Sequence, residues 1–240
     1  MLSKNDIKLI TRLKQKKYRT QDGLFVVEGL KVIHEFLKSS FQLQQLYTTV
    51  SFGLINTQET IISEAELKKI SFLNNPNKAL AVFNMKAPQV SLNDKGLIVA
   101  LDEVNDPGNL GTIIRLCDWF GVKQLVCSTN TVDCFNPKVL QSTMGSLTRV
   151  SLCYTDLQAY LKQIETPIFG TFMDGENVYA NTLPKEGVLV MGNEANGISK
   201  EIEVLVTKKI AIPRFGPLQA TESLNVATAT AILLSEFYRA

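Results

Sequence analysis

The C-terminal stretch IAIPRFGPLQATESLNVATATAILLSEFYRA, residues 210–240, reads as a short apolar strand, a loop rich in Pro and Gly, and a long Ala-rich helix. Ser223 is predicted to cap this helix, because a serine side chain can accept a hydrogen bond from the first free N–H groups. The residues expected on its packed face are Leu224, Ala227, Ala231, Leu234 and Tyr238. The pattern is also typical of an ordinary terminal amphipathic helix. Residues elsewhere in the chain are needed to tell whether this helix has a functional role.

The composition is that of a globular protein, with 240 residues, 45% of them hydrophobic and 20% charged. No apolar run has the length of a membrane span, and the N-terminus lacks the apolar core of a signal peptide, so a cytoplasmic protein without a membrane segment is expected. The four cysteines have no CxxC spacing and His34 is the single histidine. We therefore expect reduced structural thiols, no metal site and no serine–histidine triad.

Positive charge is concentrated at the N-terminus. Residues 1–20 hold seven Lys and Arg against one Asp, a net charge of +6, whereas the whole chain is +2, so the remainder carries −4. A local basic segment suits a polyanion such as RNA, although a solvated helix face gives the same pattern. The residues predicted to contact RNA here are Lys14, Lys16, Lys17 and Arg19.

Strand and helix patterns alternate along the chain and indicate an α/β fold with two domains. Residues 1–90 are predicted to form a small α/β domain that begins with a helix over 3–17 and a turn over 18–23. The polar residues 91–96 are taken as the linker. Residues 97–240 are predicted to form a larger domain with a mostly parallel sheet flanked by helices, because strands such as LIVAL at 97–101 are continuously apolar. A ligand site is then expected beyond the carboxyl ends of the strands.

Three polar, glycine-containing loops follow predicted strands of this larger domain, at residues 102–111, 192–197 and 213–225. Glycine lets the backbone approach a ligand closely, and a following helix offers free N–H groups. Neither GxGxxG after a strand nor GxxxxGK[ST] occurs, which argues against a nucleotide-dependent small-molecule enzyme. Arg115 lies in the helix after the first loop, where it could hold a phosphate or pair on the surface with Asp102 or Asp118.

Three motifs together resemble the SpoU (TrmH-like) branch of the SPOUT RNA methyltransferases. They are NLGTIIR at 109–115, an apolar strand followed by GNEANG at 188–197, and an IP pair at 212–213 followed by SLNV at 223–226 and an Ala-rich helix. The segment KKYRTQDGLFVVEG at 16–29 is similar to the substrate-binding domain of the same family. The resemblance therefore covers both predicted domains.

The resemblance implies transfer of a methyl group from S-adenosylmethionine to a ribose 2′-hydroxyl of structured RNA, with ribosomal RNA favoured over transfer RNA. It also implies a C-terminal trefoil knot and a homodimer, in which the small residues Ala227 and Ala231 would form part of the contact. The implied catalytic residues are Arg115, which would also contact RNA, Asn109, Glu194, Ser223 and Asn225. The implied cofactor-binding residues are Met191, Gly192, Asn193, Ile212, Ser223 and Leu224.

Two points stay open on the residues alone. Arg115 could act as a general base or stabilise negative charge, and the second role is favoured because a guanidinium keeps its proton in proteins. The loop 214–221 is longer than the usual connection in the family and adds Arg214 and Phe215, which could serve RNA or a subunit interface. A catalytically inactive RNA-binding or ribosome-assembly dimer with the same fold is the alternative function.

Overall fold

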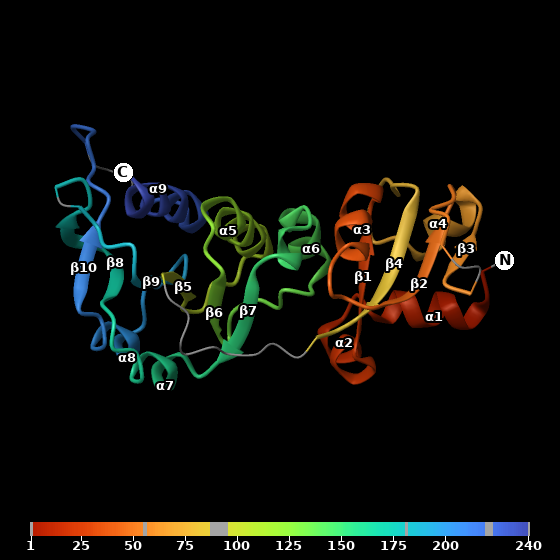
Figure 1. Ribbon diagram of the computed structural model, residues 1–240, viewed down its shortest axis with the longest axis horizontal. Helices are drawn as coiled ribbons and strands as arrows, with labels where there is room; N and C mark the ends of the chain where they lie inside the picture. Colours follow the sequence, from red (N-terminus) through yellow and green to blue (C-terminus); the bar gives the residue numbers. More distant parts are fainter. Residues whose placement is uncertain (1, 55–56, 87–95, 181, 219–222, 240) are drawn as a thin grey trace. The chain divides into compact units, whose positions relative to one another are not determined.

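The computed structural model describes residues 2–54, 57–86, 96–180, 182–218 and 223–239 (Figure 1). The chain divides into two compact units, Met1–Ala87 with Asp133–Thr148, and Pro88–Val132 with Arg149–Ala240. Of the expected linker 91–96, only Gly96 lies among the described residues. Within those residues, no helix combines the length and the apolar character needed to span a bilayer.

The first unit contains a four-stranded sheet in the order β1-β4-β2-β3. Strand β4 pairs antiparallel with both β1 and β2, and β2 pairs parallel with β3. The elements are α1 (Lys4–Arg12), α2 (Lys16–Asp22), β1 (Leu24–Glu28), α3 (Leu30–Leu37), β2 (Leu43–Thr48), β3 (Glu59–Ile61), α4 (Glu64–Ile70) and β4 (Ala79–Asn84).

The N-terminal segment differs from the prediction of one helix over 3–17 and a turn over 18–23. Helix α1 ends at Arg12, the backbone of Gln15 is extended, and α2 runs from Lys16 to Asp22. The interruption follows burial, since Ile10 and Leu13 are both 0% exposed and the chain turns after placing them in the core. The basic segment is therefore an integral part of the fold and not an appended tail.

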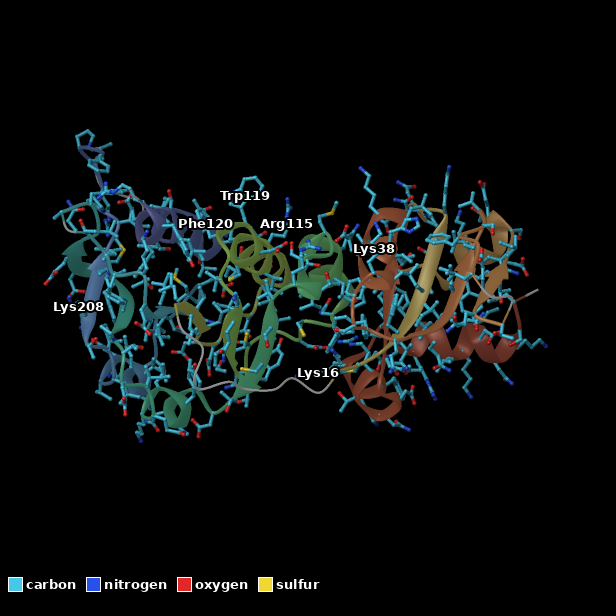
Figure 2. The ribbon with its side chains drawn as sticks, viewed as in Figure 1. Lys16, Lys38, Arg115, Trp119, Phe120 and Lys208 are labelled. Carbon is cyan, nitrogen blue, oxygen red and sulfur yellow. The ribbon has the colours of Figure 1, made fainter. Side chains whose placement is uncertain are left out.

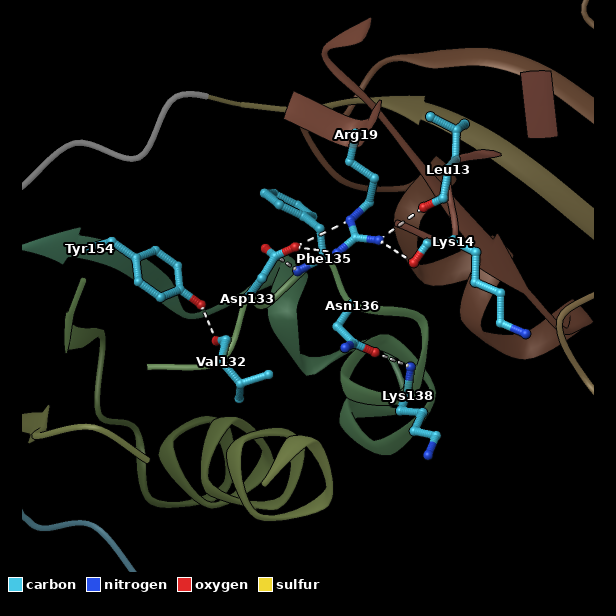
Figure 3. Close-up of polar contacts among 9 residues, drawn as sticks. All are labelled: Leu13, Lys14, Arg19, Val132, Asp133, Phe135, Asn136, Lys138 and Tyr154. Atoms are coloured by element: carbon cyan, nitrogen blue, oxygen red, sulfur yellow. Dashed lines mark hydrogen bonds and ion pairs between the residues drawn. The ribbon is translucent and has the colours of Figure 1, made fainter. Parts of the chain in front are cut away.

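Arg19 is buried, which contradicts its predicted contact with RNA. Its side chain donates from Nε and Nη2 to Oδ2 of Asp133, at 3.1 and 2.5 Å, and from Nη1 to the carbonyls of Leu13 and Lys14 at 2.9 Å (Figure 3). The residue is only 2% exposed. A guanidinium engaged in this way fixes the turn between α1 and α2 and is not available to an external phosphate.

The segment Asp133–Thr148, which contains α6 (Pro137–Thr143) and the short helix η1 (Ser146–Thr148), completes the core of the first unit. Phe135 packs against Phe25 at 4.5 Å between ring centroids, inside a cluster of phenylalanines. Gly145 has φ 96°, and a Cβ there would lie 2.8 Å from Cγ of Glu35. Local patterns could not reveal this packing, because the partners are more than 100 positions apart along the chain.

The second unit contains a six-stranded parallel sheet in the order β10-β8-β9-β5-β6-β7, which confirms the predicted α/β architecture (Figure 1). The trefoil knot that the resemblance implies stays a prediction. The elements are β5 (Leu97–Leu101), α5 (Pro107–Phe120), β6 (Gln124–Ser128), β7 (Ser151–Thr155), α7 (Leu157–Leu161), β8 (Ile168–Asn177), β9 (Gly187–Met191), α8 (Lys200–Glu203), β10 (Lys208–Ala211) and α9 (Val226–Tyr238).

Helix α9 begins two residues later than a Ser223 cap would place it. Asn225 is the cap, and its side-chain oxygen accepts from the N–H groups of Ala227 and Thr228 at 3.0 and 3.2 Å. The buried face is therefore rotated from the predicted one and consists of Val226, Ala227, Thr230, Leu233, Leu234 and Phe237. This face packs within the unit, where α9 contacts α5.

We predict that Asp133→Ala lowers the free energy of unfolding by about 3 kcal/mol or more, because it leaves the buried Arg19 charge without its partner. The matched control is Glu203→Ala, which removes the partner of Lys209 in an ion pair whose side chains are 42% and 37% exposed, and should lower the free energy of unfolding far less. Thermal and denaturant unfolding of both variants measure the difference. Equal stability of the two would contradict the structural role of Arg19.

Candidate active site

The three polar loops predicted from the sequence follow the carboxyl ends of β5, β9 and β10. These strands belong to one parallel sheet, so their carboxyl ends point the same way. Side chains from loops that are far apart in sequence can therefore meet at this edge. The hydrogen bonds show that three of the five predicted catalytic residues do so.

The side-chain amide of Asn109, in the first turn of α5, connects all three loops. Its Nδ2 donates to Oε1 of Glu194 at 3.0 Å, and its Oδ1 accepts from Nδ2 of Asn225 at 2.9 Å. The backbone N–H groups of Asn105 and Asp106 also point to the Glu194 carboxylate, at 3.4 Å. We call the chain of Glu194, Asn109 and Asn225 the amide relay.

The capping role of Asn225 fixes the direction of this relay. Its Oδ1 accepts the two N–H groups at the start of α9, so its Nδ2 is the end that is free to donate to Asn109. Asn109 must then present its oxygen to Asn225 and its nitrogen to Glu194. The N-terminus of α9 and the first turn of α5 are thereby held in one arrangement.

The loop that carries Glu194 is closed on itself. Asn193 and Gly197 exchange backbone hydrogen bonds at 2.9 Å, and Nδ2 of Asn193 donates to the carbonyl of Glu103 at 2.7 Å. A Cβ on Gly192 would lie 2.3 Å from the carbonyl carbon of Gly197, closer than any side chain tolerates. Glycine is therefore required at 192 for steric reasons, which explains the first residue of GNEANG.

Arg115 is exposed on α5, roughly 9 Å along the helix axis from Asn109 (Figure 2). Neither surface pairing considered for it is present, since Asp118 pairs with Arg149 at 2.8 Å and Asp102 accepts from the N–H of Ser199 at 2.7 Å. In the described part of the chain, no hydrogen bond or ion pair engages its guanidinium. The charge remains available to a ligand. Ser223 is also exposed and is not joined to the amide relay by any hydrogen bond among the described residues.

The predicted cofactor residues combine strand-end backbone with apolar side chains. Met191 is 1% exposed, and its carbonyl already accepts from Asp102 at 2.9 Å. Ile212 is half-buried after β10, and Leu224 is an exposed leucine, at 49%, just before the α9 cap. The close turn at Gly192 keeps the strand end free of a side chain. The exposed side chain of Leu224 and the half-buried side chain of Ile212 suit a flat heteroaromatic group such as the adenine of S-adenosylmethionine.

The loop after β10 carries an aromatic contact that the sequence did not predict. Phe215 is 82% exposed and stacks on Tyr179, with ring centroids 6.3 Å apart. Residues 219–222 of the same loop lie outside the described residues. Asp106 was also missed as a positioning residue, although an aspartate before Pro107 is a recognisable helix start and its carboxylate accepts from the N–H of Asn109 at 2.8 Å.

Thiol and metal chemistry find little support at this edge of the sheet. All four cysteines are buried, and burial raises the pKa of the Cys117 thiol to about 12 and that of Cys153 to about 11. Both thiols are therefore protonated at neutral pH and poor nucleophiles. Among the residues that the structure describes, no group of three or more His, Cys, Asp or Glu is placed to hold a metal ion.

Of the predicted RNA contacts in the first unit, Lys14, Lys16 and Lys17 are exposed, whereas Arg19 is not. Figure 2 shows Lys16 at the start of α2. These three lysines can therefore meet a phosphate backbone, and their predicted role is compatible with their placement.

Two family models match separate parts of the chain. The SpoU rRNA Methylase family matches residues 96–235, and the MRM3-like substrate binding domain matches residues 4–81. The first match covers more than half of the chain and contains the amide relay.

Individual proteins show the same likeness over nearly the whole chain. The 23S rRNA (guanosine(2553)-2′-O)-methyltransferase RlmP of Bacillus subtilis is 29% identical over 93% of this chain and 92% of its own length. A TrmH-family structure from Porphyromonas gingivalis has a TM-score of 0.88 and 37% identity, covering 99% of this chain and 98% of that one. An AdoMet-bound rRNA methyltransferase from Sinorhizobium meliloti has a TM-score of 0.87 and 28% identity, covering 100% and 97%.

We predict that Gly192→Ala destabilises the Glu194 loop, because the added Cβ forces the backbone of Gly192 and Gly197 apart. Overpacking of this kind costs about 1–3 kcal/mol. The control is Gly216→Ala, where the added Cβ has no neighbour within 4 Å. Hydrogen exchange over residues 192–198 and the Tm measure both variants, and protection of this loop unchanged in Gly192→Ala would refute the steric requirement.

Proposed function

The chain belongs to the SpoU rRNA methylase family, and we propose that it transfers the methyl group of S-adenosylmethionine to a ribose 2′-hydroxyl of ribosomal RNA. The observation that carries the proposal is the amide relay, which joins the three motif loops. Arg115 is exposed on the same helix as Asn109, and no acceptor among the described residues engages it. The first unit, whose residues 4–81 match a substrate-binding domain, is proposed to bind the RNA.

S-adenosylmethionine supplies an electrophilic methyl group on a positively charged sulfur when it is bound. The residues that would hold it are Met191, Gly192 and Asn193 at the end of β9, together with Ile212, Ser223 and Leu224 between β10 and α9. Their contribution is mainly backbone groups and apolar side chains. Such contacts bind the cofactor without neutralising the charge that makes the methyl group reactive.

Arg115 is proposed to bind an RNA phosphate and to stabilise the negative charge that develops on the ribose oxygen as its proton passes to solvent water. A guanidinium offers several N–H donors and keeps its own proton, so it acts by electrostatics and orientation and not as a base. Asn109 and Asn225 position the Glu194 carboxylate at the same edge of the sheet. Ser223 adds an exposed hydroxyl beside the start of α9.

The protein is further proposed to act as a homodimer, through the exposed face of α5. Trp119 is 85% exposed there, one helical turn after Arg115 (Figure 2). A large aromatic side chain so exposed is typical of a surface that another protein covers. Of the two small residues expected at the contact, Ala227 is 5% exposed and covered within the chain, whereas Ala231 is half-buried. A contact through Ala231 stays a prediction. A ribosomal RNA substrate also favours the cytoplasmic location expected from the sequence.

We predict that Arg115→Lys binds S-adenosylmethionine with unchanged affinity but methylates RNA about 10- to 100-fold more slowly in single turnover, less than the loss for deleting an oxyanion donor. Lysine keeps the charge but loses the planar set of donors. The control is Arg149→Lys, which makes the same change in an arginine that pairs with Asp118. Calorimetry and a pH series of single-turnover rates are the measurements. Complete loss of activity with intact cofactor and RNA binding would indicate a base, and no heat with the cofactor would refute the enzyme.

We predict that Trp119→Ser converts the dimer to a monomer, because it removes the largest exposed apolar group of α5. Val204→Ser is the control, since Val204 is 77% exposed at the end of α8 but is not part of the proposed surface. Light scattering after gel filtration gives the mass of each variant. A monomeric wild type, or a Trp119 variant that remains dimeric, would contradict the proposed contact.

A further inference from the structure

The outward face of α3 carries two lysines with a histidine between them. Lys31, His34 and Lys38 recur at helical spacing, and all three are exposed. Lys86 joins them near the end of the helix, where its Nζ donates to Oγ of Ser40 at 2.7 Å. The only acidic residue of α3, Glu35, lies on the side that meets Gly145. The exposed face is therefore positive without an acidic side chain of the same helix on it.

Lys38 caps the C-terminal end of α3, where a cation is favourable for the helix itself, so its charge alone does not identify a partner. An aromatic pair distinguishes this face. The ring of His34 stacks on that of Phe52, with centroids 4.6 Å apart and planes inclined by 28°. Phe52 comes from the connection between β2 and β3, so two separate segments of the unit bring the rings together.

The connection that carries Phe52 is held in place by Glu59. Oε1 of its carboxylate accepts from the N–H of Phe52 at 2.7 Å, and Oε2 accepts from the N–H of Leu54 at 2.8 Å. The aromatic pair is thus positioned by the protein's own hydrogen bonds before any partner binds. Such preorganisation lowers the entropy cost of binding.

We infer that this surface, formed by Lys31, His34, Lys38, Phe52 and Lys86 and called here the α3 surface, binds the ribosomal RNA substrate. The lysines neutralise backbone phosphates, and an unpaired base stacks on the His34–Phe52 pair. Sequence-tolerant stacking on aromatic rings flanked by cations is a common way to hold single-stranded RNA. An acidic protein segment would use the lysines but would gain little from a stacked aromatic pair. The inference rests on the proposed function and adds a contact region outside the N-terminal segment 1–20.

The test compares the cations with a matched pair elsewhere in the unit. Lys31→Gln/Lys38→Gln is expected to weaken binding of ribosomal RNA about tenfold, and to reduce the slope of log affinity against log salt by about 0.7 to 0.9 per lost phosphate contact. Lys68→Gln/Lys69→Gln, which removes the same charge from the exposed end of α4, is the control and should retain the wild-type slope. Fluorescence anisotropy with a ribosomal RNA transcript at several salt concentrations gives both quantities.

The aromatic pair is tested separately by His34→Ala and Phe52→Leu. Loss of stacking should weaken RNA binding by about five- to a hundredfold and leave the salt slope unchanged, because no charge–phosphate contact is lost with Phe52. The Tm of each variant establishes that it is folded.

Wild-type affinity and slope in the lysine variant would overturn the inference, and wild-type affinity in both aromatic variants would overturn base stacking. A wild type that binds RNA through this surface but methylates none would refute the proposed function and leave the inference standing.

Discussion

The arrangement of the second unit depends on one side-chain amide, that of Asn109. It accepts a hydrogen bond from Asn225 and donates one to Glu194, so the loops after β5, β9 and β10 have to adopt their positions together. Asn225 has no freedom to reverse this relay, because its oxygen caps α9. The side chain of Asn225 therefore contributes both to the stability of α9 and to the geometry of the polar site. A change at Asn225 is expected to affect both.

Arg115 is not part of the amide relay, and its surroundings differ from those of the buried arginine in the first unit. Arg115 lies on the same helix as Asn109 but, among the described residues, is engaged by no acceptor, while the carboxylates of Asp102 and Asp118 have other partners. Arg19 contrasts with it, because its guanidinium donates hydrogen bonds to Asp133 and to two backbone carbonyls in the first unit. Burial and pairing therefore separate an arginine that holds the fold from one that is available to a phosphate, although the two are alike in sequence.

Local sequence patterns predicted most of the strands, the parallel sheet and the loops that form the site, because apolar runs and glycine-containing loops report local requirements. They failed where contacts between residues far apart in the sequence determine the structure. The break between α1 and α2 follows from burial of Leu13 and Arg19, and the packing of Phe135 on Phe25 joins segments that no periodicity connects. The Ser223 cap failed for a different reason, since Ser223 and Asn225 are both good caps and only the hydrogen bonds to Ala227 and Thr228 distinguish them.

The central claim is that this chain methylates a ribose hydroxyl of ribosomal RNA. Its most direct test is incubation with S-adenosylmethionine labelled in the methyl group and with separated ribosomal and transfer RNA, followed by alkaline hydrolysis. A methylated 2′-oxygen cannot attack the neighbouring phosphate, so the account predicts label in alkali-resistant dinucleotides from ribosomal RNA. Label that appears only in single nucleotides, which would indicate methylation of a base, or only in transfer RNA, would contradict it.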